Sequence, residues 1–204
     1  FYLWNSKFKF NKNFKKNQFL EISKLPLLIK PLNLSTYFKS SFSKIIKPFD
    51  IFWKPNYSIS SNIKLIENNF DVEFNNLSQK SFNQFSLFHF KNKEYLQWRY
   101  LDHPTRNYRV LSLSDNSKLI GYIVTREMNV FSKKLGIIVD LFVDPLYTNK
   151  MVFQPLIKKT LLDFWNNDVS MVISTSKIGN LETKILRKSG FFTAPSFLKQ
   201  EKLP

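Results

Sequence analysis

An acidic residue inside an apolar run is the first candidate for chemistry in this sequence. Asp140 lies within residues 135–143, where almost every other side chain is apolar. A carboxylate in such a run costs free energy unless it is paired or faces a cleft. Asp140 is therefore a candidate general base. The alternative is a structural carboxylate, held by an arginine such as Arg99 or by backbone N–H groups.

Two further side chains are weaker candidates for proton transfer. Glu127 stands at the end of a β-rich run and is a second candidate base, while Tyr147 stands in a loop from which its hydroxyl can donate a proton. An exposed loop tyrosine is the alternative for Tyr147. His103 precedes a proline, which favours a turn residue hydrogen-bonded to the backbone over a catalytic one.

Composition argues against several other classes of protein. The chain has no cysteine and only two histidines, so we expect no disulfide and no metal site. No apolar run approaches the roughly 18–20 residues of a membrane-spanning helix, so no membrane span is expected. The absence of cysteine fits a reducing compartment, and we expect a cytoplasmic protein.

The elements that must position these residues follow from apolar spacing. Helical spacing occurs at residues 34–47, 61–69, 94–101, 156–165 and 181–189. Beta-rich runs occur at residues 108–114, 119–126, 135–143, 169–174 and 191–198. Asp115-Asn116-Ser117 is a hairpin signal between the first two runs, and Gly190 is a C-cap signal. Residues 25–31 are expected to be extended between prolines, and residues 70–88 give no clear prediction.

The order of these elements predicts an α/β fold. A strand, a helix and a strand in succession form a right-handed crossover, so at least two strands are parallel within a mixed sheet flanked by helices. We expect residues 50–204 to form this domain and residues 1–49 to be a separate basic segment.

Three strings then resemble the GNAT acyl-CoA N-acyltransferases, over roughly residues 85–197. The first is the hairpin that ends in Leu119-Ile-Gly-Tyr-Ile-Val124. The second runs from Ile137 to Ile157 and resembles that family's central strand, V-x-P turn, acyl-CoA loop and following helix. The third, Asn180-Leu-Glu-Thr-Lys-Ile-Leu-Arg-Lys-Ser-Gly-Phe191, resembles the helix that ends in "K-x-G-F". The resemblance implies a GNAT-like fold and acyl transfer from acetyl-CoA to a small amine.

A fourth string narrows the type. Residues 93–104, followed by Tyr108, resemble the "Y-L-x-W-R-Y/F…P…Y" entry of GNAT-like proteins from bacterial surface-polysaccharide gene clusters. This likeness implies an amino sugar as one acceptor. Such proteins can carry two GNAT-like halves, which would make the basic segment the end of a preceding half. Trp98 and Tyr100 would line the acceptor pocket, unless they are core residues.

The resemblance also implies where the co-substrate would lie. In that family the pantetheine arm lies between two splayed parallel strands, and backbone N–H groups at a helix N-terminus bind the diphosphate. The corresponding residues here are Leu141, Phe142, Val143, Asn149, Lys150, Met151, Val152, Phe153 and Asn180.

Several positions depart from the family pattern. In the loop, Thr148 replaces an Arg or Gln, and Met151 and Phe153 replace small residues that permit a close approach of phosphate to backbone. Pro155 fits best at the first helical position, which would start the helix late. Leu186 replaces the tyrosine that often protonates the CoA thiolate. Two hypotheses stay open: an active transferase with an altered loop, or a GNAT-shaped domain that no longer binds acyl-CoA.

A third hypothesis comes from the net charge of +16. Such an excess favours nucleic acid or an anionic surface as the partner. The basic residues are mostly lysine, whereas bidentate phosphate contacts favour arginine. We therefore interpret the basic residues as a solvated surface and expect no nucleic-acid partner.

Overall fold

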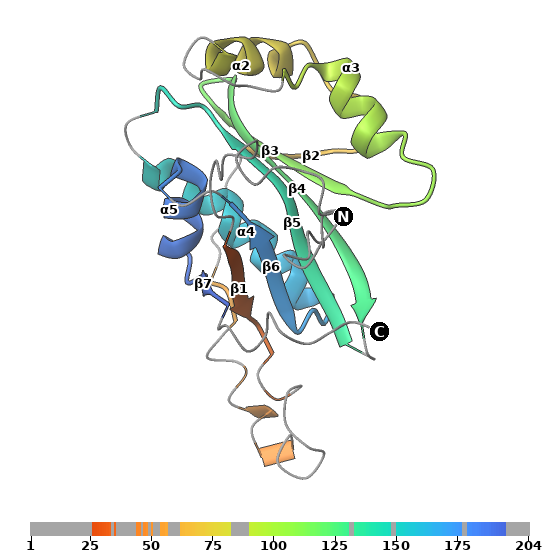
Figure 1. Cartoon of the computed structure of the whole chain (residues 1–204), viewed down its shortest axis with the longest axis vertical. Helices are drawn as coiled ribbons and strands as arrows, with labels where there is room; N and C mark the ends of the chain where they lie inside the picture. Colours follow the sequence, from red (N-terminus) through yellow and green to blue (C-terminus); the bar gives the residue numbers. More distant parts are fainter. Residues whose placement is uncertain are drawn as a thin grey trace, which may run out of the picture.

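The computed structural model describes residues 26–33, 35, 44–45, 47–48, 50, 54–56, 62–82, 90–130, 133–147, 150–176 and 179–194. In these ranges seven strands form one mixed sheet in the order β2-β3-β4-β5-β6-β1-β7 (Figure 1). The strands are β1 (Leu27–Pro31), β2 (Ile63–Ile66), β3 (Arg109–Asp115), β4 (Lys118–Val130), β5 (Lys133–Val143), β6 (Met171–Thr175) and β7 (Phe192–Thr193). The helices are α2 (Glu73–Phe82), α3 (Lys93–Leu96), the π-helix η4 (Gln97–Leu101), the 3-10 helix η5 (Lys150–Phe153), α4 (Gln154–Asn166) and α5 (Leu181–Lys188).

The centre of the sheet is the antiparallel set β3, β4 and β5. The β3–β4 hairpin turns through Asn116 and Ser117, whose φ angles are 45° and 64°. Positive φ at both central residues of a two-residue turn matches the right-handed twist of the strands. The predicted hairpin is thereby confirmed.

Helices cover the two faces of the sheet differently. On one face α4 and α5 pack in a core cluster that includes Leu156, Ile157 and Ile185, all with 0% exposure. On the other face α2, α3 and η4 pack in a second cluster around Phe74 and Tyr122. In Figure 1 α2 and α3 lie at the top of the view, and α4 and α5 lie lower, beside β6.

The predicted crossover is present. β5 leads through α4 to β6, and the two strands pair in parallel from Leu135↔Met171 to Ile138↔Ser174. Gly190 ends α5 with a φ of 86°, as its C-cap signal indicated. Of the strand expected over 191–198, the described part forms only the two-residue strand β7, and residues 195–198 lie outside the described ranges.

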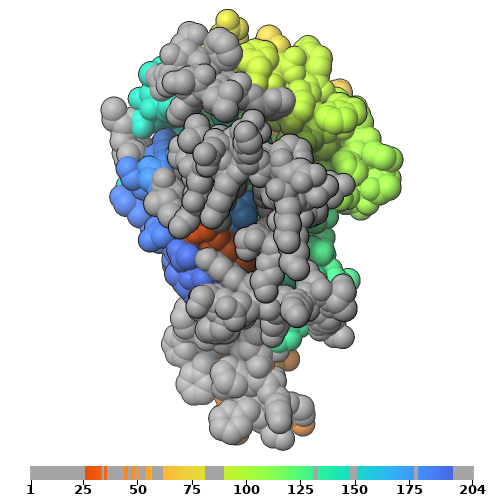
Figure 2. Space-filling model, viewed as in Figure 1, coloured from red at the N-terminus to blue at the C-terminus, as the bar shows by residue number. Residues whose placement is uncertain are grey.

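The proline-flanked segment near the N-terminus is a strand of the same sheet. β1 lies between β6 and β7 and pairs antiparallel with both. Leu28 and Leu32 are 0% exposed and belong to the cluster that contains α4 and α5. In Figure 2 the red-orange surface of β1 lies directly beside the blue surface of the C-terminal elements. The helix expected over 34–47 lies largely outside the described residues.

Two predicted elements differ from the structure. The helix expected over 61–69 is wrong, because Ile63–Ile66 forms strand β2 on β3. Four residues with two β-branched isoleucines gain more from pairing with a neighbouring strand than from one helical turn. Within 70–88, helix α2 begins after Asp71, whose Oδ1 accepts a hydrogen bond from the Glu73 N–H at 2.9 Å. The helix predicted over 94–101 is confirmed, with its second half in π-helical form.

Candidate functional site

Strand β5 extends beyond its parallel neighbour β6, which ends at Thr175. Their pairing ends at Ile138↔Ser174, while β5 continues to Val143. Within the described ranges, residues 140–143 thus pair with β4 but not with β6. A section of strand without a neighbour on one side has backbone N–H and C=O groups that can bond to a ligand.

The backbone groups of this segment that point away from β4 belong to Leu141 and Val143. The N–H of Asp144 donates to the carbonyl of Ile120 in β4 at 2.7 Å. Because the direction of backbone groups alternates along a strand, residues 140 and 142 share this orientation toward β4. The N–H and C=O groups of Leu141 and Val143 therefore point to the β6 side.

A β-bulge turns Asp140 to the face that carries α2 and α3. Val124 pairs with Asp140 and Thr125 with Ile138, so Val139 is an extra residue in β5. Ile138 packs in the cluster that contains α4, whereas Asp140 contacts side chains of the opposite cluster. A bulge commonly redirects a side chain in this way.

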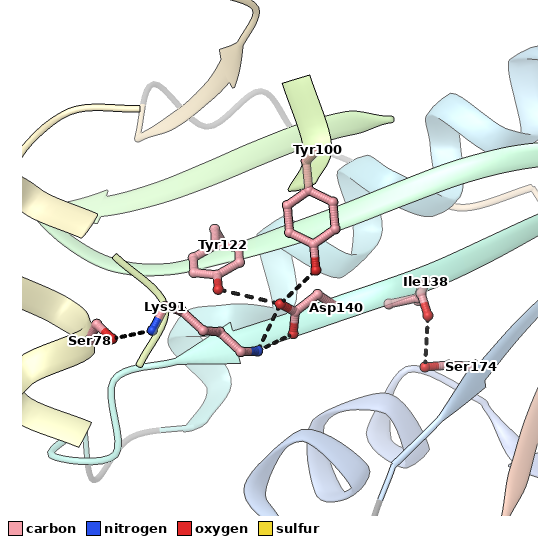
Figure 3. Close-up of polar contacts among 7 residues, drawn as sticks. All are labelled: Ser78, Lys91, Tyr100, Tyr122, Ile138, Asp140 and Ser174. Atoms are coloured by element: carbon pink, nitrogen blue, oxygen red, sulfur yellow. Dashed lines mark hydrogen bonds and ion pairs between the residues drawn. The ribbon is translucent and has the colours of Figure 1, made fainter. Parts of the chain in front are cut away.

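Three side chains surround the carboxylate of Asp140, as Figure 3 shows. The ammonium of Lys91 donates to Oδ1 at 2.7 Å and to Oδ2 at 2.8 Å. The hydroxyls of Tyr100 and Tyr122 donate to Oδ2 at 3.2 Å and 3.4 Å. The alternative partner considered from sequence, Arg99, lies over the Tyr100 ring with its guanidinium carbon 5.6 Å from the centroid. Lys91 is instead the ion-pair partner.

The two tyrosines act as hydrogen-bond donors. Burial raises the pKa of the Tyr100 hydroxyl, and the nearby negative charge of Asp140 raises it further. The same two causes raise the pKa of Tyr122. Both phenols therefore stay protonated near neutral pH. Tyr100 lies in η4, and π-helical turns are frequent at functional sites.

Glu182 is a second carboxyl group near this cluster. It lies in the first turn of α5 and is partly buried. Burial raises its pKa; the charge of Lys91 lowers it and that of Asp140 raises it. Glu182 is thus within electrostatic reach of both. Sequence reasoning missed Glu182 and Lys91, since neither stands at a distinctive spacing. A carboxylate in the helix after a parallel strand was the one available signal.

Glu127 does not join this cluster. It lines a cavity of about 380 Å³ between α4 and the sheet, together with Arg109 and Asp163. Its carboxylate accepts from the Asn167 side chain at 2.6 Å and pairs with Lys134 at 2.9 Å. The cavity is on the face opposite to Tyr100 and Tyr122.

Tyr147 lies beside the β3–β4 hairpin. Its hydroxyl donates to Oδ2 of Asp115 at 2.9 Å. Burial raises the pKa of Tyr147, and the hydrogen bond to Asp115 raises it further. This hydroxyl is a weaker acid than a free tyrosine, and its hydrogen-bond partner is not part of the Asp140 cluster. His103 accepts from the Thr105 N–H at 3.3 Å, the turn contact expected for it.

The loop before α4 places its two bulky residues differently. Phe153 is 0% exposed and packs under Gly121, where an added Cβ would lie 3.2 Å from the Phe153 ring and 2.9 Å from the carbonyl oxygen of Phe142. Met151 is 53% exposed, and Val152 is partly buried. The Phe153 ring thus fills the core and does not stand before the helix N-terminus.

The remaining loop positions have separate outcomes. Lys150 begins η5, whereas Asn149 and Thr148 lie outside the described residues. Pro155 lies in the first turn of α4, but the helix begins before it, at Gln154, so the expected late start does not occur. Asn180 is exposed at the N-cap of α5 and makes no side-chain capping bond. Leu186 is 0% exposed in the core, so that position supplies no acid.

The described residues contain neither a cluster of metal ligands nor a membrane-spanning helix. No group of three His, Cys, Asp or Glu side chains in these ranges is arranged to hold a metal ion. None of the helices that the structure describes is both long and apolar enough to cross a membrane.

Comparison with known proteins gives structural neighbours but no sequence relatives. No protein-family model and no curated protein matches this chain. Two structures of Saccharomyces cerevisiae N-myristoyltransferase with bound myristoyl-CoA superpose with TM-scores of 0.59 and 0.57 at 11% and 10% identity. They cover 83% and 84% of this chain, which spans only 45% and 48% of theirs. A weaker match, with a TM-score of 0.48 and 18% identity, is an aminoglycoside acetyltransferase from an uncultured soil metagenomic sample in complex with sisomicin. It covers 70% of this chain and 90% of that one.

The two N-myristoyltransferase structures agree with the element order and the sheet topology of this chain. This chain has a mixed sheet, a parallel strand pair joined by α4 and helices on both faces of the sheet. The fold of this chain is therefore that of the GNAT N-acyltransferases.

Proposed function

We propose that this chain is an acyl-CoA-dependent N-acyltransferase that acts on a small primary amine. The observation that carries the proposal is that β5 runs on beyond the end of β6 directly beside a carboxylate. Asp140 stands two residues beyond the last pair of the parallel ladder, Ile138↔Ser174. A thioester that lay between the strands would thus be close to a base.

The backbone of β5 fits the acyl donor. The outward N–H and C=O groups of Leu141 and Val143 match the amide groups of a pantetheine arm, which alternate donor and acceptor in the same way. An N–H group of this segment can also donate to the thioester oxygen, where negative charge develops. Acetyl-CoA is the donor that we propose.

The side chains near Asp140 fit the acceptor. A base must lie within hydrogen-bond reach of the proton it removes, and the Asp140 carboxylate already holds an ammonium at that distance. In the reaction the carboxylate would take one proton from the acceptor ammonium. The nitrogen would then attack the thioester carbon, CoA would leave as thiolate, and the thiolate would take the second proton from the nitrogen. An amino sugar is the acceptor that the resemblance at residues 93–104 implies.

The diphosphate site is the altered part of the proposal. With the Phe153 ring in the core, the backbone of η5 and the first turn of α4 are not blocked by that ring. Pro155 removes one N–H donor from this turn. The resulting affinity for CoA would be lower than that of a loop with its full set of N–H groups.

A second candidate is a GNAT-shaped domain that does not bind acyl-CoA. It is favoured by the ion pair of Asp140 with Lys91, which engages both oxygens of the proposed base, and by Leu186 at the position of the usual acid. Such a domain would serve in structure or recognition.

A thermal-shift titration separates the two candidates. Acetyl-CoA at millimolar concentration should raise the melting temperature by about 5 °C if the ligand is near 100 times its Kd. ATP at the same concentration is the control, because a chain of charge +16 binds polyanions non-specifically. A shift with acetyl-CoA alone supports the transferase. Equal shifts, or none, favour the second candidate.

Two other features are also proposals. We propose that the chain acts in the cytoplasm and without a nucleic-acid partner. We propose too that residues 1–49 are the end of a preceding GNAT-like half, a role compatible with the strand that they contribute beside β6 and β7. Nucleic-acid binding would be revealed by an affinity that falls steeply between low and physiological salt.

A further inference from the structure

We propose that Lys91 is an intramolecular acceptor, so that the chain transfers an acyl group from acyl-CoA to its own Lys91 side chain. This inference rests on the proposed transferase function. It adds a modification site in the segment between α2 and α3.

The Lys91 amine lies within reach of the proposed base. Among the described residues, Lys91 is the amine that lies within hydrogen-bond distance of Asp140, at 2.7 Å and 2.8 Å from its two oxygens. This is the relation that a general base needs with the ammonium it deprotonates. The Lys91 side chain thus occupies the place that the mechanism assigns to the acceptor.

The Lys91 amine also lies close to the place proposed for the acyl donor. The Lys91 ammonium lies 5.1 Å from the centroid of the Phe142 ring. Phe142 stands between Leu141 and Val143, whose backbone groups face the space between β5 and β6. The amine is therefore beside the section of β5 along which the thioester would lie.

Lys91 is held in place by its backbone and by partial burial. The Lys91 backbone N–H donates to the Ser78 hydroxyl of α2 at 2.8 Å, which anchors the residue (Figure 3). Its side chain is only 22% exposed. Holding a nucleophile near its target replaces part of the entropy cost of a bimolecular reaction. A fixed and partly shielded lysine should react faster than a solvated one.

The reaction balances with acyl-CoA as the only co-reactant. The Asp140 carboxylate accepts a proton from the ammonium, and the free Nζ lone pair attacks the thioester carbon. The C–N bond forms, the C–S bond breaks, and CoA leaves as thiolate, which takes up the second proton that the new nitrogen loses as it becomes an amide. The product is a neutral amide at Lys91, and the proton on Asp140 passes to solvent.

The test uses the purified chain with isotope-labelled acetyl-CoA, followed by peptide mapping with a protease that does not cut at lysine. Lys93 is the matched control, because it lies two residues away on the same peptide and its side chain is 43% exposed. We expect labelling of Lys91 at least tenfold faster than labelling of Lys93. The urea-unfolded chain gives the intrinsic ratio of the two rates.

Two variants make the test specific. Asp140→Asn should bring the Lys91 rate down to that of Lys93 and leave Lys93 unchanged. Lys91→Arg keeps the positive charge and should remove the fast-labelled site without labelling elsewhere.

The outcomes separate the two proposals. If acetyl-CoA raises the melting temperature but Lys91 is labelled no faster than Lys93, the inference about Lys91 is wrong and the transferase proposal stands. If acetyl-CoA produces no thermal shift and no selective labelling, both are wrong. Selective labelling that persists in Asp140→Asn would overturn the role of Asp140 in the reaction.

Discussion

The ammonium nitrogen of Lys91 bridges both carboxylate oxygens of Asp140, across 49 residues of chain. The side chains of the two residues are 22% and 12% exposed, so water screens their charges only in part. The pair lies where β5 extends beyond the end of β6. Its energetic and chemical roles can be measured separately.

Replacing Asp140 tests both roles. Asp140→Asn should lower the free energy of unfolding by about 1–3 kcal/mol, because the Lys91 ammonium loses its charge partner in a partly buried site. Turnover of an added amine should be lost while the thermal shift with acetyl-CoA persists. Urea unfolding and a CoA-release assay measure the two effects. Undiminished turnover would show that Asp140 is not the base.

A double-mutant cycle isolates the ion pair itself. Lys91→Met removes the ammonium, and the double variant Asp140→Asn with Lys91→Met should be more stable than the sum of the two single losses indicates. Strictly additive losses would mean that the pair contributes no coupling energy.

Truncation of the loop residue Phe153 should lower stability much more than truncation of its neighbour Met151. Phe153→Ala should cost about 3–5 kcal/mol, because a ring with 0% exposure leaves a cavity. Met151→Ala, at a side chain that is 53% exposed, should change stability by no more than about 0.5 kcal/mol. Urea denaturation of the two variants provides the comparison. Similar losses at both positions would contradict the buried place of Phe153.

Glu182 should make stability depend on pH. Its pKa in the folded chain is raised, chiefly by burial, above the ordinary value of 4.5. The folded state then binds more protons than the unfolded state between 4.5 and the raised pKa, so stability falls as pH rises through this window. Glu182→Gln should remove this slope. The stability of the variant relative to the parent chain should therefore be higher at pH 7 than at pH 4.

The measurement is urea unfolding at several pH values between 4 and 7. Glu94→Gln is the matched control, because the Glu94 side chain is 62% exposed and should leave the slope unchanged. An equal change in slope for both variants would assign the effect to overall charge and not to the burial of Glu182.

Strand β1 should be essential to the fold. Leu28→Ala removes a side chain of 0% exposure from the core cluster and should cost about 2–5 kcal/mol. Leu65→Ala is the control in the edge strand β2, where the side chain is 41% exposed and the loss should stay below about 1 kcal/mol. A small effect at Leu28 would mean that β1 is dispensable for the sheet.

Local signals predicted much of the framework. The hairpin at Asn116 and Ser117, the cap at Gly190 and the proline in the first turn of α4 all depend on backbone preferences of a few adjacent residues. Two apolar runs predicted the buried strands β5 and β6, and helical spacing between them predicted α4, so the parallel crossover followed from their order. Strand β2 was misjudged, since four residues show no reliable period and β3 supplied the pairing.

By itself the sequence determined the order of the elements, the turns that join them and the unusual position of a carboxylate in an apolar strand. Only the tertiary structure decided what that carboxylate contacts. The bulge at Val139 turns Asp140 toward Tyr122, and the packing of α2 and η4 brings in Lys91 and Tyr100. The reason is physical: turns and periodicity are properties of neighbouring residues, whereas an ion pair between distant segments exists only after the sheet and its helices have packed.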